Sequence, residues 1–144
     1  MSTQPYKVLA TFRPERWIPR RVGPQLVKLT ARLGYKPLKV KKLRLHKQAL
    51  WRSRRLHADL TTRTNPHSEA TSWHQDGDLT QDFPLDHGLI LWATNTPTEL
   101  KLPSGEVVRP RPYEVIFVRN RDVHHRQPPD AKRVRWLFRQ RVSL

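Results

Sequence analysis

Short apolar runs broken by Pro, Gly, Asn and Asp dominate the chain from about residue 70 onward. Runs of this length between turn-forming residues predict β-strands. The runs TELKL (98–102) and EVVR (106–109) are joined by Pro-Ser-Gly, and Gly105 suits the turn of a β-hairpin. Several short strands at such close spacing predict a sandwich or a small barrel. The expected strands are residues 88–94, 98–102, 106–109, 113–118 and 133–139.

The first part of the chain has a different pattern. The segment GPQLVKLTARLG (23–34) predicts a short helix, with Gly23 and Pro24 at its start and Gly34 at its end. Its leucines fall on one side of that helix; they are Leu26, Leu29 and Leu33. The next segment (36–56) alternates at first and then becomes compatible with a helix, so its structure stays open.

The length of 144 residues, of which 36% are hydrophobic, suits one domain with a modest core. We expect a mainly β domain in which a basic, partly helical or extended region, residues 1–69, packs on a β core, residues 70–144. The chain contains no cysteine, which excludes disulfides, thiolate-bound zinc, iron–sulfur clusters and a cysteine nucleophile. Any bound metal must therefore be held by His, Asp or Glu.

The net charge of +16 is spread unevenly. Residues 1–65 hold 17 of the 28 Lys and Arg but only two of the 12 acids, Glu15 and Asp59. Such crowding of like charge favours a surface that faces a polyanion. The alternative is a solvated basic face without a partner.

No apolar run approaches the roughly 18 residues that a membrane span requires. The N-terminal residues also lack the continuous apolar segment of a signal peptide. We therefore expect a soluble, cytoplasmic protein, as a monomer or a weak dimer.

The segment TSWHQDGDL (71–79) carries a histidine and an aspartate two residues apart, His74 and Asp76. In an extended segment such residues point to the same side, so both could reach one metal ion. A further histidine, His124 or His125, follows the expected strand at 113–118. Two histidines and one carboxylate form the facial triad of non-haem Fe(II) oxygenases, and Mn(II) or Co(II) could occupy the same ligands.

The segment RVRWLFRQ (133–140) alternates apolar and basic residues. As a strand it would place Arg135 and Arg139 on one face, roughly 13 Å apart along the backbone. Arginine binds carboxylates through two parallel hydrogen bonds and stays charged when buried, so the pair could hold both ends of a small dicarboxylate. The alternative is a basic edge strand whose charge prevents aggregation.

The order His-x-Asp, a strand-rich stretch, Asn-x-x-x-x-His and Arg-Trp-Leu-x-Arg resembles the Fe(II)/2-oxoglutarate-dependent dioxygenase superfamily. The similarity is greatest to the group that contains taurine dioxygenase and clavaminate synthase, and it covers about residues 70–142. The resemblance implies a double-stranded β-helix, which is a jelly-roll or cupin-like barrel. Only 48 residues lie between Asp76 and His125, so such a barrel would be near minimal.

The resemblance also implies roles for individual residues. His74 and Asp76 would be the first two iron ligands. Counting five residues from Asn120 gives His125 as the third ligand, with His124 as its competitor.

The co-substrate would be held by the C-terminal strand. Arg135 matches the arginine that binds the 5-carboxylate of 2-oxoglutarate, Arg139 matches a second arginine nearer the 1-carboxylate, and Thr98 would help to hold the 5-carboxylate. The implied reaction uses Fe(II), 2-oxoglutarate and O₂ to hydroxylate or demethylate a substrate. Trp73 and Trp92 would either line the pocket or lie in the core.

The basic N-terminal half favours a nucleic acid as the substrate, either DNA or RNA. Trp17, Tyr35 and Trp51 lie among its Lys and Arg, where they could stack on bases or pack in the core. An acidic protein target and a small anion are the alternatives. Two other kinds of protein also fit: a basic binding module without catalysis, and a cupin-like metalloenzyme that does not use 2-oxoglutarate.

Overall fold

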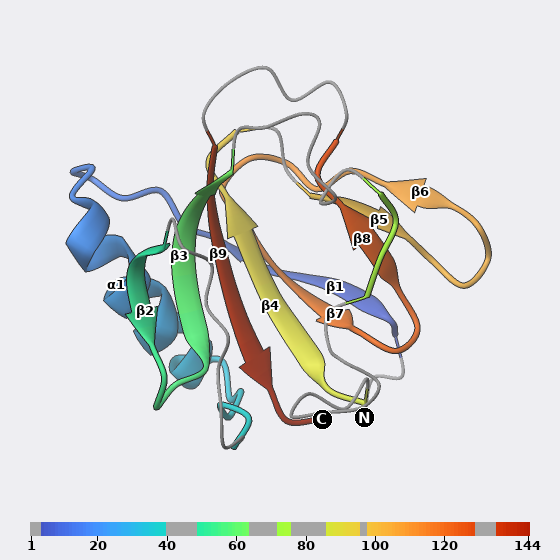
Figure 1. The fold of residues 1–144 in the computed structure, drawn as a ribbon, viewed down its shortest axis with the longest axis horizontal. Helices are drawn as coiled ribbons and strands as arrows, with labels where there is room; N and C mark the ends of the chain where they lie inside the picture. The colour runs from blue at the N-terminus through green and yellow to red at the C-terminus, as the bar shows by residue number, and fades with distance from the viewer. Residues whose placement is uncertain (1–3, 40–48, 64–71, 76–85, 96–97, 129–134) are drawn as a thin grey trace.

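The structure is a computed structural model that describes residues 4–39, 49–63, 72–75, 86–95, 98–128 and 135–144. Within these ranges the chain forms the helix α1 (Pro19–Arg32) and two antiparallel sheets (Figure 1). The six-stranded sheet has the order β1-β7-β4-β9-β3-β2, and the three-stranded sheet has the order β6-β5-β8. The strands of the larger sheet are β1 (Tyr6–Thr11), β2 (Ala49–Ser53), β3 (Ala58–Arg63), β4 (Gly88–Ala93), β7 (Glu114–Arg119) and β9 (Arg135–Val142). Those of the smaller sheet are β5 (Glu99–Lys101), β6 (Val107–Val108) and β8 (His124–Arg126).

One face of the larger sheet packs against α1. Alternate residues of the strands point toward the helix, because successive side chains of a strand lie on opposite faces. On β9, for example, Trp136, Phe138 and Val142 belong to this layer. The buried residues of this core are Val22, Leu26, Ala58, Leu60, Ile90, Trp92, Val115, Phe138 and Val142.

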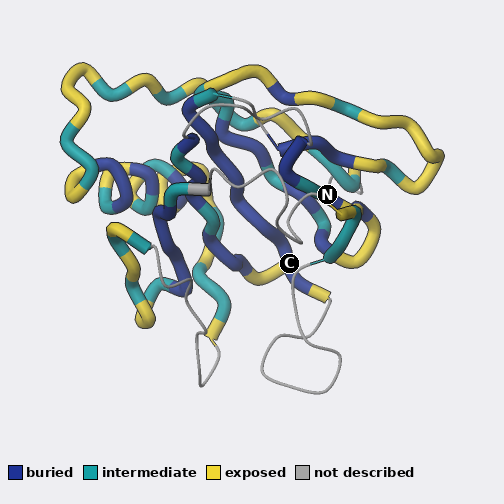
Figure 2. The backbone as a smooth tube through the Cα atoms, turned by 45° about the horizontal axis from the view of Figure 1, so that its top comes forward, coloured by how far each residue is buried: buried dark blue, intermediate teal, exposed yellow. Residues whose placement is uncertain are grey.

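The opposite face of the larger sheet packs against the smaller sheet. The buried residues of this second core are Leu89, Leu91, Leu100, Ile116, Val118 and Val123. Strand β4 contributes to both cores and is buried at all six positions. This explains why its sequence, GLILWA, is apolar throughout. Figure 2 shows the buried backbone gathered in the central strands.

The strands expected from residue 88 onward are confirmed, with small differences in their ends. The β5–β6 hairpin is confirmed too: Leu100 pairs with Val108, and Gly105 turns with φ of 89°. The backbone N–H of Gly105 donates to the carbonyl of Leu102 at 2.8 Å. Hydrogen bonding between the described strands does not close the two sheets into a barrel.

The expected start of the helix is wrong. The helix begins at Pro19, where a proline suits the first turn, and Gly23 and Pro24 lie inside it. Gly23 packs closely on Trp51, and a Cβ atom at this position would lie 2.4 Å from the indole ring. This close contact explains why a glycine occupies a position inside the helix. Gly34 ends the helix as expected, with φ of 92° directly after the C-cap.

The first 69 residues do more than pack on a β core. They contribute β1, β2 and β3 to the larger sheet, where β1 pairs with β7 and β3 pairs with β9. The open segment 36–56 contains β2 in its later part, while residues 40–48 lie outside the described ranges. No helix in the described part of the chain is long and apolar enough to cross a membrane.

Candidate metal and dicarboxylate site

His74 forms an antiparallel backbone pair with His125 of β8, next to the smaller sheet. The N–H of His74 donates to the carbonyl of His125 at 3.0 Å, and the N–H of His125 donates to the carbonyl of His74 at 2.9 Å. Residues paired in this way present their side chains on the same face. The ring centroids accordingly lie 4.4 Å apart, with 63° between the ring planes. Two imidazoles from distant parts of the chain are thus brought to one point.

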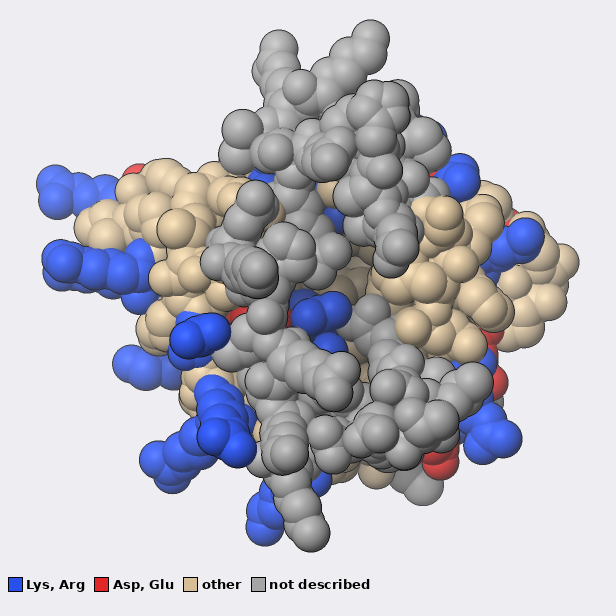
Figure 3. All heavy atoms as spheres, in the orientation of Figure 1, with Lys and Arg blue, Asp and Glu red and all other residues tan. Residues whose placement is uncertain are grey.

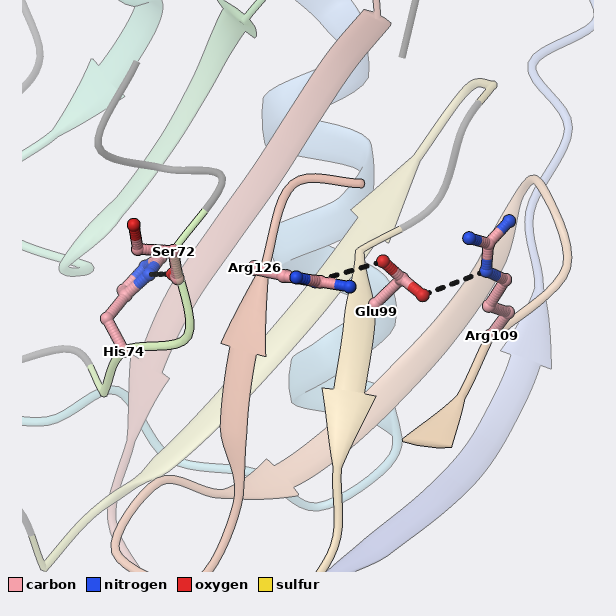
Figure 4. Close-up of polar contacts among 5 residues, drawn as sticks. All are labelled: Ser72, His74, Glu99, Arg109 and Arg126. Carbon is pink, nitrogen blue, oxygen red and sulfur yellow. Dashed lines mark hydrogen bonds and ion pairs between the residues drawn. The ribbon is translucent and has the colours of Figure 1, made fainter. Parts of the chain in front are cut away.

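The ring of His74 has a defined orientation. Its Nδ1 lies 2.7 Å from the backbone carbonyl of Ser72 (Figure 4). A carbonyl oxygen only accepts hydrogen bonds, so Nδ1 is the donor, and in the neutral ring Nε2 then carries the lone pair. This arrangement, with one nitrogen tied to a carbonyl and the other able to bind a metal, is typical of metal-ligating histidines.

Gln75 fixes the short segment that carries His74. Its Nε2 donates to the carbonyls of Asn120 at 3.0 Å and Arg121 at 2.7 Å. These carbonyls belong to the turn that follows β7 and leads to His125. Gln75 therefore ties both histidine-bearing segments together, a role that the sequence pattern did not indicate.

The two candidates for the distal histidine are placed differently. His125 is 6% exposed and faces His74, whereas the neighbouring His124 is exposed and pairs with Lys101 of β5. Adjacent residues of a strand point to opposite faces, so only one of them can face His74. Asp76 lies outside the described residues, and among those described no group of three His, Asp or Glu could hold a metal.

Arg135 and Thr98 lie in contact. Arg135 is 1% exposed, and its Nη1 donates to the Thr98 hydroxyl at 3.4 Å. Thr98 directly precedes β5, and its side chain is also buried. The guanidinium of Arg135 therefore lies on the face of β9 that is turned toward the smaller sheet, in contact with Thr98.

The face of β9 that carries Arg135 is strongly basic. Arg139 and Arg141 share it at the alternate positions, and both are largely buried. Asp59, from β3, lies opposite Arg139 with 3.6 Å between Nε and Oδ1. Because β9 lies between β4 and β3, the alternative of a basic edge strand is wrong. The resemblance implies a position for Arg139 near the 1-carboxylate of 2-oxoglutarate. In the structure its guanidinium lies beside the carboxylate of Asp59 instead.

Strand β5 links the histidine pair to the arginine. His125 is the cross-strand partner of Leu100, and Arg135 contacts Thr98 two residues earlier. Two residues of extended chain span roughly 7 Å. His125 and Arg135 therefore contact the same strand, β5, at positions that lie two residues apart.

Glu99 braces the smaller sheet from its other face. It is 2% exposed, and its two oxygens accept from Arg109 Nε at 2.9 Å and Arg126 Nε at 3.1 Å (Figure 4). The guanidinium of Arg126 also lies 4.3 Å from the centre of the Trp73 ring. Trp73 thus packs on Arg126, and Trp92 lies in the helix-side core with its indole N–H donated to the Phe12 carbonyl.

In comparisons with known proteins, no family model, no curated protein and no solved structure matches the chain. The assignment of the site therefore depends on its own geometry.

Proposed function

We propose that the protein is an Fe(II)- and 2-oxoglutarate-dependent oxygenase. The observation that carries this proposal is the His74–His125 pair: His125 pairs with Leu100 of β5, and the buried Arg135 contacts Thr98, two residues before Leu100. Two converging imidazoles can ligate a metal ion, and a buried guanidinium can pair with a carboxylate. We infer that the two sheets are the layers of a double-stranded β-helix.

The metal would be held by Nε2 of His74, by His125 and by the carboxylate of Asp76. The first of these is favoured by the tautomer that Ser72 imposes. The donor set of two imidazoles and one carboxylate suits Fe(II) and leaves coordination positions for other ligands. Gln75 keeps the two imidazoles in register through its bonds to the turn after β7.

The distal carboxylate of 2-oxoglutarate would pair with Arg135. A guanidinium can donate two parallel hydrogen bonds to a carboxylate, and Thr98 adds a hydroxyl beside it. The low exposure of this group strengthens the ion pair because water is largely excluded. Arg141, on the same face, adds positive potential that favours a dianion, whereas the charge of Arg139 is offset by Asp59.

When bound, Fe(II) and 2-oxoglutarate supply the oxidising chemistry of the site. The overall reaction converts a substrate C–H, O₂ and 2-oxoglutarate into C–OH, succinate and CO₂, so that one oxygen atom enters each oxidised product. The protein's own residues orient the co-substrate and hold the site between the sheets.

The proposal is tested by adding Fe(II) and 2-oxoglutarate to the protein without oxygen and recording the visible spectrum. A weak charge-transfer band that needs both additions is expected. The His125→Ala variant should lose the band, and the matched His124→Ala variant should keep it. A parent protein without the band, folded by circular dichroism, would contradict the proposed function.

A further inference from the structure

Two hollows lie on the helix side of the larger sheet, on the face opposite the histidine pair. The segment between β1 and α1 separates these hollows, which measure about 390 and 330 Å³. Arg13 and Pro14 line both hollows, and the two hollows together are called here the Trp17 groove. The larger hollow is lined by Arg13, Pro14, Trp17, Thr94, Asn95, Tyr113 and Trp136.

Aromatic rings form the walls of the larger hollow. The Trp17 ring packs against Trp92 with 16° between the planes and meets Trp136 edge-on, at a centroid distance of 5.0 Å. Despite these contacts Trp17 remains 41% exposed. Its indole is therefore supported by the core on one side and presents the rest of its surface to the hollow.

The groove is also cationic. The guanidinium of Arg13 lies 4.4 Å from the centre of the Tyr113 ring, and Arg16 and Arg21 line the smaller hollow together with a single acid, Glu15. Figure 3 shows Lys and Arg gathered over the α1 and β2 side, while acids lie mainly toward the opposite side. The exposed basic residues of α1 and β2 are Arg20, Arg21, Lys28, Arg32 and Arg52.

Two details of the larger hollow indicate a ligand. The Oδ1 of Asn95 is buried there and accepts no hydrogen bond from the described residues. Tyr113 adopts φ of 68°, a left-handed conformation that a bulky residue rarely takes and that recurs at ligand-binding sites. The site therefore offers an aromatic surface, an acceptor for an N–H group and neighbouring cations.

We propose that the Trp17 groove binds single-stranded nucleic acid. A base would stack on Trp17 and donate to Asn95, while Arg13, Arg16 and Arg21 would bind phosphates along the smaller hollow. An aromatic cage for a cationic ligand does not fit, because Arg13 already covers the Tyr113 ring. A paired base does not fit either, since its faces stack on neighbouring base pairs.

The other aromatic residues considered for base stacking have different positions. Trp51 lies under Gly23 of the helix and stacks on Phe138, and Tyr35 stacks on Phe117. Both pack against the core. Trp17 thus differs from them because it lines an open hollow. Binding of nucleic acid in the Trp17 groove does not depend on the proposed oxygenase activity.

Binding is measured by fluorescence anisotropy with labelled 12-nucleotide strands of oligo-dT and oligo-U and with a duplex of equal length, in the absence of iron and 2-oxoglutarate. Tighter binding of a single strand than of the duplex is expected. Trp17→Ala should weaken single-strand binding about tenfold or more, and Arg13→Gln should weaken it and reduce its salt dependence. The DNA and RNA strands show which sugar is preferred.

Three further variants keep the test decisive. Arg52→Gln removes an exposed charge outside the groove and should change affinity less than Arg13→Gln does. Trp17→Phe is included in case Trp17→Ala folds poorly. It keeps an aromatic ring at this position, so it should retain most of the affinity for the single strand. His125→Ala should leave binding unchanged, which separates this inference from the proposed function. Equal affinities of the parent, Trp17→Ala and Arg13→Gln, or preference for the duplex, would overturn it.

Discussion

The buried guanidinium of Arg135 donates to the hydroxyl of Thr98, with 3.4 Å between Nη1 and Oγ1. The two residues lie 37 positions apart in the sequence and meet between the two sheets. Placing a permanent cation at 1% exposure is costly unless it is compensated. In the proposed function, a carboxylate of 2-oxoglutarate would pair with this guanidinium.

The first prediction concerns this pair. Arg135→Gln should weaken 2-oxoglutarate binding by about one to two orders of magnitude, because a charge-assisted bond to a charged group contributes about 1.5–3 kcal/mol. Thr98→Val should weaken it only about fivefold, because one neutral hydrogen bond is lost. Calorimetric titration of the Fe(II)-loaded protein measures both changes. Arg52→Gln on the outer strand β2 is the matched control, and identical affinities of the parent and Arg135→Gln would exclude this role.

The second prediction separates the adjacent histidines. His125→Ala should weaken Co(II) binding by at least tenfold, since one of the proposed ligands is removed, whereas His124→Ala should bind as the parent does. The Co(II) absorption spectrum gives both affinities and reports the ligand environment. The opposite ranking of these two variants would assign the metal to the outer face of β8 and reject the proposed site.

The third prediction tests the packing of α1 on β2. Replacing glycine by alanine inside a helix usually stabilises it by about 1 kcal/mol. At Gly23 the added Cβ would lie 2.4 Å from the Trp51 ring, so the free energy of unfolding should instead fall by about 1–3 kcal/mol. Urea unfolding measures the change. Lys28→Ala, at an exposed position of the same helix, should have little effect, and a more stable Gly23→Ala protein would show that the helix does not pack closely here.

The fourth prediction concerns pH. Burial, together with the positive charges of Arg141 and Arg54, lowers the pKa of His57 below its ordinary value of 6.5. Below pH 6.5 the unfolded chain therefore binds a proton that the folded chain does not, and stability falls as the pH decreases. The melting temperature should drop between pH 7.5 and pH 5.

The His57→Asn variant should show a smaller drop over the same pH range. Asparagine suits this position because the backbone of His57 has φ of 47°, which asparagine tolerates. His124→Asn, at an exposed position, serves as the control and should retain the slope of the parent. If parent and His57→Asn lose stability in parallel, another group governs the acid sensitivity.

The sequence predicted the elements that depend on local pattern. Short apolar runs between turn residues gave the strands of the C-terminal half, and Gly105 gave the hairpin. The sequence was less informative about β1 (YKVLAT) and β3 (ADLTTR). Their polar residues obscure the alternation of apolar and polar positions that predicts a strand. These segments become strands by pairing with β7 and β9, which lie far away in the chain.

Local pattern fixed the chemical types available to this protein: imidazoles, carboxylates and guanidiniums without thiols, and a cationic N-terminal half. Choosing between His124 and His125 needed the cross-strand pair with His74, because moving a strand by one residue turns every side chain to the other face. Bringing Arg135 to Thr98, and Trp17 to Tyr113 and Trp136, likewise needed packing between distant segments. Residue types and short-range periodicity can be read from the sequence alone. Side chains from distant segments come together only when the sheets assemble.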